Sequence, residues 1–275
     1  MRVRKRFGQH FLTDRGVLEQ IARAIAPRRA DKLLEIGPGH GALTGMLFGS
    51  TARYLAVEID RDLIPFLRAR FAGLELVNDD ILRVDLDAVL GGDGAPWRLV
   101  GNLPYNISTP LVVRLLAHLR HIADMHFMLQ REVAARLAGS PGSKAWGRIT
   151  VLTQYHCEVE RLFDVSPESF EPPPRVWSAV VRLVPRTDKL PLSGPAALDR
   201  VLRAAFGQRR KRLGNALQSL PLDWTRAGVD QDRRADDLSV ADFVALANAL
   251  LDDPTPSSIR PQERSSDRDP NPEEP

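Results

Sequence analysis

The sequence at residues 33–44 is Leu-Leu-Glu-Ile-Gly-Pro-Gly-His-Gly-Ala-Leu-Thr, a short apolar run that meets a cluster of glycines. An apolar run of this length before glycines predicts a buried strand that ends in a tight turn. Glycine lacks the Cβ atom that would keep a ligand away from the backbone. The stretch therefore predicts a strand, a ligand-binding turn that contains Gly37 and Gly39, and then a helix.

Further strands and helices alternate along the first half of the chain. Strand-like runs fall at 53–59, 74–78, 97–101 and 125–129. Helical periodicity falls at 13–26, 41–49, 61–71, 108–119 and 131–138. This alternation predicts parallel βαβ units and a sheet that is covered by helices on both faces.

The last part of the predicted sheet has a different pattern. Residues 157–165 and 177–184 are strand-like, and no helix of useful length lies between them. We expect these two segments to close the sheet as an antiparallel pair. The predicted fold class is α/β, a doubly wound, Rossmann-like domain over residues 1–185.

After Pro185 the chain changes character. Prolines and a glycine indicate a linker, and helical periodicity follows at 196–206, 209–219 and 239–251. Ser239 and Asp242 form a capping-box pattern at the start of the last helix. We expect a small all-α domain over residues 190–252. Residues 253–275 are rich in proline, serine and charge, and we expect a disordered tail because they cannot bury enough apolar surface to offset ordering.

The composition is that of a globular protein, with 43% apolar, 27% charged and 6% aromatic residues. Cys157 is the single cysteine, so no intrachain disulfide is possible. No run approaches the roughly 18 apolar residues of a membrane span, and no apolar stretch follows the basic start. His118 and His121 lack further ligands at suitable spacing, so we predict no metal site. We expect a cytoplasmic, monomeric protein without a membrane partner.

The formal net charge is only +3, but basic residues gather in two places. Residues 1–15 include Arg4, Lys5 and Arg6, and residues 200–212 hold six basic residues and no acid. Two such clusters suggest a polyanion partner, and the nucleic-acid-binding candidates are Arg4, Lys5, Arg6, Arg209, Arg210 and Lys211. A solvated surface is the alternative interpretation, which charge alone does not exclude.

Two acids follow the glycine turn at the places where a nucleoside cofactor would need them. Glu58 ends the second strand, 21 residues after Gly37, where an acid accepts hydrogen bonds from ribose hydroxyls. Asp80 ends the third strand, where a carboxylate can accept a hydrogen bond from the amino group of adenine. NAD and an adenosyl cofactor both fit these acids. Pro38 removes one backbone N–H that a pyrophosphate would need, which favours S-adenosylmethionine.

The sequence Asn102-Leu103-Pro104-Tyr105 follows the fourth strand, so we expect it at the same edge of the sheet. An exocyclic adenine amine is a poor nucleophile because its lone pair is delocalised into the ring. The Asn102 side-chain oxygen and the Leu103 carbonyl can accept its two N–H groups and localise that lone pair. Pro104 stiffens the turn, and the Tyr105 ring can stack on the base. An Asn-x-Pro turn without a ligand is the alternative for this tetrapeptide taken alone.

The chain resembles the small-subunit ribosomal RNA adenine dimethyltransferase family, the kasugamycin-resistance dimethylases, from Lys5 to about Leu251. The stretches that carry the resemblance are 6–14, 35–39, 57–60, 102–110, 122–130, 170–178 and 206–211. The resemblance implies a class I S-adenosylmethionine methyltransferase fold and cofactor contacts at His10, Leu12, Gly37, Glu58, Asp80 and Asn102. Many members of the family have asparagine where His10 stands. The resemblance also implies that Phe170 contacts the target base opposite Tyr105, although residues 170–178 alone would suggest a rigid linker.

The same resemblance implies an activity. Such enzymes place two methyl groups on N6 of each of two adjacent adenosines in the 3′-terminal hairpin loop of 16S ribosomal RNA, within a precursor of the small subunit. The helical domain would contact the ribosomal RNA. Two alternatives remain open: a dimethylase of large-subunit ribosomal RNA that confers antibiotic resistance, and a non-enzymatic nucleic-acid-binding assembly factor on the same fold.

Overall fold

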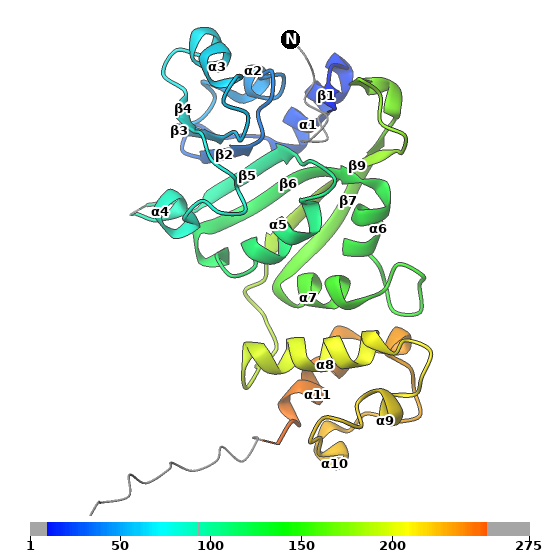
Figure 1. Cartoon of the computed structure of the whole chain (residues 1–275). Coiled ribbons are helices and arrows are strands. Elements are labelled where there is room, and N and C mark those ends of the chain that lie inside the picture. The colour runs from blue at the N-terminus through cyan, green and yellow to red at the C-terminus, as the bar shows by residue number, and fades with distance from the viewer. Residues whose placement is uncertain (1–9, 93, 252–275) are drawn as a thin grey trace, which may run out of the picture.

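The centre of the molecule is one seven-stranded sheet in the order β4-β3-β2-β5-β6-β9-β7 (Figure 1). The structure, a computed structural model, describes residues 10–92 and 94–251. The strands are β2 (Lys32–Ile36), β3 (Arg53–Val57), β4 (Glu75–Val77), β5 (Trp97–Asn102), β6 (Ile122–Gln130), β7 (Cys157–Val165) and β9 (Ser178–Pro185). Neighbours from β4 to β6 are parallel, whereas β9 is antiparallel to both β6 and β7. The predicted fold class and the antiparallel pair are confirmed.

Two layers of helices cover the two faces because neighbouring strand residues point in opposite directions. On β2, Leu33 packs with the helices α1 (Arg15–Ile25), α2 (Thr44–Leu47) and α3 (Ile64–Arg70). Its neighbour Leu34 packs on the opposite face, with the helices α4 (Leu86–Leu90), α5 (Ser108–Leu115) and α6 (Arg131–Leu137). In Figure 1 the first layer lies above the sheet, and α5 and α6 lie below it. The strands therefore end between two fixed layers, which leaves their carboxyl edge open for a site.

Two predicted helices are much shorter than expected. The helix predicted at 41–49 is reduced to α2, because Gly41 and Gly49 have φ angles of +73° and +85°, outside the helical region. The helix predicted at 209–219 is reduced to α9 (Leu213–Ala216), and residues 208–211 form a turn in which the Lys211 N–H donates to the Gln208 carbonyl at 2.8 Å. Arg209, Arg210 and Lys211 therefore lie on a loop and not on a helix.

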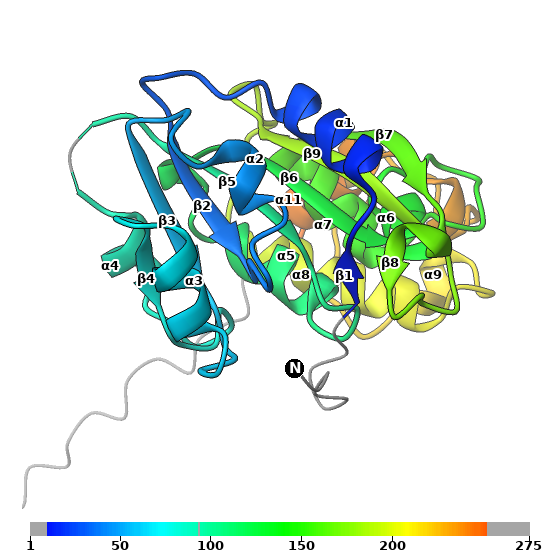
Figure 2. The ribbon, with the colours of Figure 1, turned by 90° about the horizontal axis from the view of Figure 1, so that it is seen from above.

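The structure contains several elements that the periodicity did not indicate. Strand β1 (Phe11–Leu12) pairs antiparallel with β8 (Phe170–Glu171), and Figure 2 shows the two side by side. The N–H groups of Thr13 and Asp14 both donate to the Ser169 carbonyl, at 2.9 and 3.2 Å. Helix α7 (Arg148–His156) precedes β7. Short 3₁₀ turns occur at Leu119–His121, Pro167–Ser169 and Ala235–Asp237. The β1–β8 pair therefore holds a segment from the start of the sheet domain's sequence against a segment from near its end.

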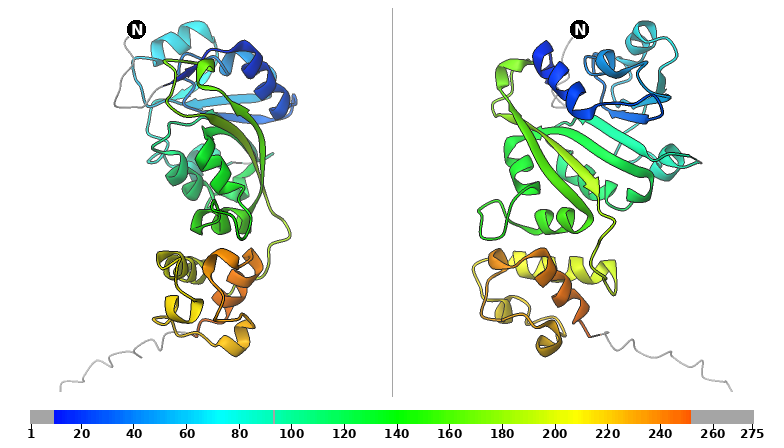
Figure 3. Two further views of the ribbon diagram at one scale, coloured as in Figure 1. Left: turned by 90° about the vertical axis from the view of Figure 1, so that its right-hand side faces the viewer. Right: turned by 180° about the vertical axis from the view of Figure 1, so that it is seen from behind.

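The C-terminal helices form a second lobe, which Figure 3 shows below the sheet. They are α8 (Pro195–Gly207), α9, α10 (Trp224–Ala227) and α11 (Val240–Asn248), and α11 begins with the expected capping box of Ser239 and Asp242. Their apolar core includes Trp146 and Val151 from around α7. The division near residue 185 stays a prediction, and the packing shows that α7 belongs to both sides of it. The tail prediction falls on residues outside the described part.

The described ranges contain neither a candidate membrane-spanning helix nor a candidate metal-binding cluster. No helix there has the length and apolar character that crossing a bilayer would need. The same residues contain no group of three or more His, Cys, Asp or Glu side chains arranged around a possible metal ion.

Cys157 is fully buried, and burial raises the pKa of its thiol to about 12. A thiol so buried is a packing residue and not a nucleophile.

Candidate active site

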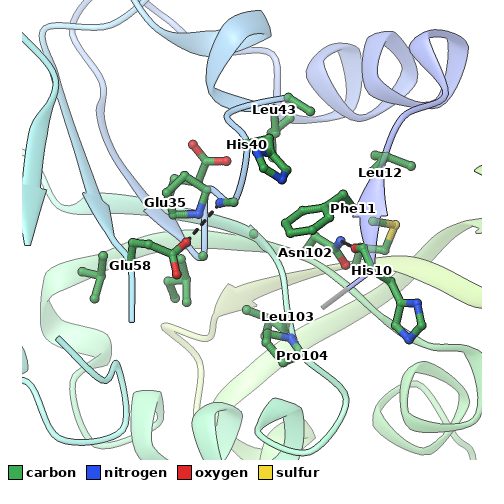
Figure 4. A pocket seen from close by; sticks show the side chains of 18 of the residues that line it. His10, Phe11, Leu12, Glu35, His40, Leu43, Glu58, Asn102, Leu103 and Pro104 are labelled. Carbon is green, nitrogen blue, oxygen red and sulfur yellow. Dashed lines mark hydrogen bonds between the residues drawn. The ribbon is translucent and has the colours of Figure 1, made fainter. Parts of the chain in front are cut away.

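A cavity of about 620 Å³ opens at the carboxyl edge of the parallel strands. Ten of the predicted site residues line it: His10, Leu12, Gly37, Gly39, Glu58, Asp80, Asn102, Leu103, Pro104 and Tyr105. Figure 4 shows Glu58 on one side of the cavity and Asn102 with Leu103 on the other, with Phe11 and His40 between them. The predicted cofactor residues and the predicted target residues therefore share one space.

The glycine turn after β2 offers no cradle for a pyrophosphate. The N–H groups of Gly37, Gly39 and Gly41 already donate to acceptors within the protein, at 2.9, 3.1 and 2.8 Å, and Pro38 has no N–H. A phosphate site at such a turn needs free backbone donors. Gly37 has a φ angle of +68°, and a Cβ atom built on it meets no protein atom within 4 Å. The turn thus favours an uncharged nucleoside over a dinucleotide.

Glu58 is held at the end of β3 with only 4% of its surface exposed. Its two carboxylate oxygens accept one N–H each, from Gly39 at 3.1 Å and from Asp60 at 2.8 Å. Asn78 donates to the Glu58 backbone carbonyl at 2.7 Å and joins β3 to the loop after β4. Burial raises the pKa of Glu58, and the two backbone donors oppose that shift. The side chain is fixed but keeps lone pairs that ribose hydroxyls can use.

Asp80 lies on the loop after β4, where the cavity meets the edge of the sheet. Its Oδ1 accepts the Leu82 N–H at 2.9 Å, and its side chain is about one-third exposed. The other oxygen is 3.8 Å from the exposed Arg83 guanidinium. One carboxylate oxygen is therefore tied to the backbone while the other can accept a further hydrogen bond.

Glu35 also lines the cavity, and sequence reasoning assigned it no role. It lies on β2 and is 2% exposed. Its Oε2 accepts hydrogen bonds from the Thr44 hydroxyl at 2.6 Å and from the Tyr54 hydroxyl at 2.7 Å. Burial raises the pKa of the Glu35 carboxyl group from 4.5 to about 7, although the two hydrogen bonds act in the opposite direction. The sequence signal was an acid inside an apolar strand, which is uncommon without a structural or chemical reason.

The raised pKa of Glu35 predicts a pH-dependent loss of stability. Between pH 4.5 and about 7 the folded protein keeps a proton that the unfolded chain has lost, so the free energy of unfolding falls as the pH rises. The fall amounts to roughly 3 kcal/mol. Glu35→Gln should flatten this part of the profile in urea unfolding measured at several pH values. Glu19→Gln, at a partly exposed surface side chain, is the matched control, and an unchanged slope in Glu35→Gln would contradict the assignment.

The Asn102 side chain has a defined orientation in the loop after β5. Its Nδ2 atom donates to the His10 carbonyl oxygen at 3.0 Å. Because a carbonyl only accepts, the amide nitrogen must face His10 and the amide oxygen must face away. Within residues 10–92 and 94–251, neither the Asn102 amide oxygen nor the Leu103 carbonyl oxygen accepts a hydrogen bond. The loop therefore presents two free acceptors, and the sequence could not show that His10 orients one of them.

Close packing around this loop fixes its position. Gly101 lies so near β2 that a Cβ atom there would be 2.6 Å from the Ile36 carbonyl oxygen. The Pro104 carbonyl accepts the Ile107 N–H at 3.1 Å and the Ser108 hydroxyl at 3.0 Å, so the loop leads directly into α5. The acceptors are thus carried by a short, hydrogen-bonded connection between β5 and α5.

Tyr105 is held at both ends of its side chain. Its hydroxyl group lies 3.1 Å from the Ser178 hydroxyl, and its ring lies beside the His10 ring, with centroids 5.8 Å apart and planes inclined by 26°. The His10 Nδ1 atom is 2.7 Å from the Pro172 carbonyl oxygen, so this nitrogen carries a proton. The His10 ring therefore lies on the Tyr105 side of the cavity, while the cofactor role of His10 stays a prediction.

Phe170 lies outside the lining of the cavity, and its contact with the target base stays a prediction. Phe170 is 4% exposed, packs in the same apolar cluster as Leu12 and Leu18, and is not among the residues that line the cavity. The cause is the β1–β8 pair, which directs its side chain toward α1. The aromatic ring that does lie beside Tyr105 is His10.

The basic clusters are only partly available to a partner. Arg4, Lys5 and Arg6 lie outside the described residues. Arg209 is committed within the protein, since it pairs with Asp236 at 2.8 Å and donates to the Trp146 carbonyl at 2.8 Å. Arg210 and Lys211 are exposed and make no ion pair with any residue that the structure describes. The cluster at 209–211 therefore offers two free cations and not three.

Known proteins share the sequence of this chain over most of its length. A family model described as ribosomal RNA adenine dimethylase matches residues 1–252. Ribosomal RNA small subunit methyltransferase A of Pseudomonas fluorescens is 50% identical over 263 residues, which cover 94% of this chain and 97% of that protein. The protein of the same name from Pseudomonas aeruginosa is 52% identical over 260 residues, with 92% and 96% covered. The sequence likeness extends through both lobes.

Solved structures are similar over nearly the same length. A dimethyladenosine transferase from Plasmodium falciparum matches with a TM-score of 0.74 at 25% identity, and the match covers 86% of this chain and 96% of that one. The 23S rRNA methyltransferase ErmE matches with a TM-score of 0.68 at 28% identity, over 87% and 99% of the two chains. The structural likeness therefore extends over most of both chains.

Proposed function

Because this chain belongs to the ribosomal RNA adenine dimethylase family, we propose that it places two methyl groups on N6 of each of two adjacent adenosines in the 3′-terminal hairpin loop of 16S ribosomal RNA. The protein is an enzyme that methylates ribosomal RNA, with S-adenosylmethionine as its methyl donor. An identity of about 50% to small-subunit methyltransferases, against 28% to the 23S rRNA methyltransferase, supports the small subunit as the source of the substrate.

One observation carries the catalytic part of the proposal: the Asn102 amide nitrogen is bound to the His10 carbonyl. The Asn102 oxygen and the Leu103 carbonyl oxygen are then left as the acceptors for the two N–H groups of an adenine amine. Hydrogen bonds from both N–H groups to these oxygens favour a tetrahedral nitrogen whose lone pair points out of the ring plane. Because the donors and acceptors are positioned before the reaction, little reorganisation is needed in the transition state.

The residues on the other side of the cavity fit S-adenosylmethionine. Glu58 is positioned for the ribose hydroxyls, Asp80 for the adenine amine, and Gly37 leaves room beside the backbone. When bound, this cofactor supplies an electrophilic methyl group on a sulfonium. Tyr105 would hold the target base by stacking, and its position beside His10 keeps the ring in place. No strong general base is required, because the proton can leave to water once the nitrogen has become positively charged.

We propose a precursor of the small ribosomal subunit as the substrate, and a monomer that acts in the cytoplasm. The exposed Arg210 and Lys211 support contact with a polyanion at the second lobe. Asn102, Tyr105 and the cofactor residues line one cavity, which argues against a non-enzymatic assembly factor.

The proposal is tested by transfer of labelled methyl groups to three substrates side by side. These are undermodified small subunits, mature small subunits and large subunits, and the product nucleoside is identified after digestion. We expect N6,N6-dimethyladenosine from the undermodified small subunits alone. Labelling of the large subunits would establish the antibiotic-resistance type of activity instead. No labelling of any particle would remove the methyl-transfer assignment.

A separate prediction concerns the loop at 208–212. Replacing Arg210 and Lys211 with alanine should reduce the slope of log Kobs for RNA against log salt by roughly 0.7 for each phosphate group that the variant no longer binds. Arg209→Ala is the matched control. It should affect mainly stability, by about 1 kcal/mol or less, because its partners are Asp236 and the Trp146 carbonyl. An unchanged slope in the double variant would return this loop to an ordinary solvated surface.

A further inference from the structure

Residues 172–177 connect β8 to β9 and expose two large apolar side chains. Trp177 and Val176 are each 44% exposed. The chain has three other tryptophans, of which Trp97 and Trp146 are at most 1% exposed and Trp224 is half-buried. An indole this exposed stays in water unless a binding partner covers it. Figure 2 shows where this connection starts, at β8 beside β1.

The contacts of this segment place Trp177 at the edge of the sheet that carries the target loop. The next residue, Ser178, hydrogen bonds to Tyr105 and pairs with Gln130, the last residue of β6. The Trp177 carbonyl accepts the Arg131 N–H at 2.9 Å. Two residues before Gln130 on β6, Met128 is the register partner of Asn102. Trp177 is therefore a near neighbour of the loop that receives the target adenine.

Two arginines lie close to Trp177, Arg131 beside its ring and Arg175 two residues before it. The Arg131 guanidinium lies over the indole ring, 5.7 Å from its centroid. Arg131 and Arg175 are both exposed, and neither forms an ion pair with another residue of the described ranges. The neighbouring acid Glu132 is paired with Arg136. An exposed indole flanked by uncompensated guanidinium groups fits an unpaired nucleotide, since bases stack on tryptophan and phosphates bind arginine.

We propose that Trp177 and Arg131, with Arg175, form a subsite for an unpaired nucleotide adjacent to the target adenosine. The base stacks on the indole, and the arginines bind the phosphates on either side. This subsite adds a second contact to the proposed RNA substrate. The identity of that RNA rests on the proposed function. The uncompensated positive charge favours RNA over an apolar protein surface as the partner. Its effect is to hold the strand next to an everted base, so it acts on binding and not on the chemical step.

The first test uses the fluorescence of Trp177 in full-length Trp224→Phe protein, because the remaining tryptophans are buried. Short unpaired RNA that contains two adjacent adenosines is titrated without methyl donor, and the same RNA in a duplex serves as the comparison. We expect quenching by the unpaired RNA and little quenching by the duplex. Since no transfer is measured, this result does not depend on which ribosomal subunit the enzyme modifies.

The second test compares variants by RNA affinity and by kinetics. Trp177→Ala should weaken binding of the unpaired RNA by about 10- to 100-fold, raise KM and leave kcat at saturating RNA unchanged. Trp177→Phe should keep most of the affinity, and Arg131→Gln should reduce the salt slope by roughly 0.7. The control is Leu190→Ala, which removes an equally exposed apolar side chain from the linker before α8 and should change nothing.

Three results would overturn this subsite. The first is equal affinity of Trp177→Ala and the unchanged protein for RNA. The second is quenching by assembled subunits but not by RNA alone, which would assign Trp177 to a protein contact. The third is a fall in kcat with unchanged KM in Trp177→Ala, since this would assign Trp177 to the chemical step. If labelled-methyl transfer identified large-subunit RNA as the substrate, the proposed function would fail while quenching by unpaired RNA would still support the subsite.

Discussion

Asn102→Ala is expected to lower kcat by about 10²- to 10³-fold while folding and RNA binding are retained. The loss follows from the removal of one of the two free acceptors that the loop presents to the target amine. Folding should persist because the Asn102 side chain makes a single hydrogen bond, to the His10 carbonyl, and is partly exposed. The measurements are single-turnover methyl transfer, RNA affinity and the urea midpoint.

Two further variants make this result specific. Asn102→Asp keeps the size of the side chain but has no N–H for the His10 carbonyl, so its carboxylate would face another acceptor and kcat should also fall. Asn215→Ala removes an exposed amide on α9 and should leave all three measurements unchanged. Turnover of Asn102→Ala at the rate of the unchanged protein would refute the role of this side chain.

Gly101→Ala should have the largest effect on the sheet. The new methyl carbon would lie 2.6 Å from the Ile36 carbonyl oxygen, and neither backbone can move freely because both strands are in the middle of the sheet. Overpacking of this kind costs about 1–3 kcal/mol, and a clash with backbone belongs at the upper end. The strands would separate at the point where the glycine turn and the target loop face each other, so methyl transfer should fall as well.

The control for Gly101→Ala is Gly207→Ala, at the end of α8. A Cβ atom there meets nothing within 4 Å, and alanine is a better helix former than glycine. This variant should have unchanged or slightly higher stability in urea unfolding. If Gly101→Ala unfolded at the same urea concentration as Gly207→Ala, the close approach of β5 to β2 would not constrain residue 101.

The parts of the fold that depend on local pattern were predictable. Apolar runs before Gly37 and Asn102 predicted parallel strands, and the rule that ligands bind at their carboxyl ends predicted one shared cavity. The structure confirms that shared cavity. The chemistry of the turn was also visible, because Pro38 has no N–H in any conformation. These features depend on single residues and their nearest neighbours, so a sequence contains them directly.

Other parts depend on contacts between distant segments. Strand β1 has two residues and therefore no period, and its partner β8 lies about 160 residues later. The same pair turns Phe170 into the apolar core, which no local pattern indicates. Residues 209–219 were predicted as helix from their periodicity, but Arg209 instead pairs with Asp236 on a neighbouring turn, and the helix begins only at Leu213. The role of the His10 carbonyl likewise depends on a long-range hydrogen bond.

The β1–β8 pair has a consequence for when the enzyme first becomes active. A chain leaves the ribosome from its N-terminus, so His10 emerges long before Ser169 and Pro172, the residues that hold its segment in place. Until those residues are available, nothing fixes the carbonyl that orients the amide of Asn102. A nascent chain that ends before β9 therefore lacks a working site.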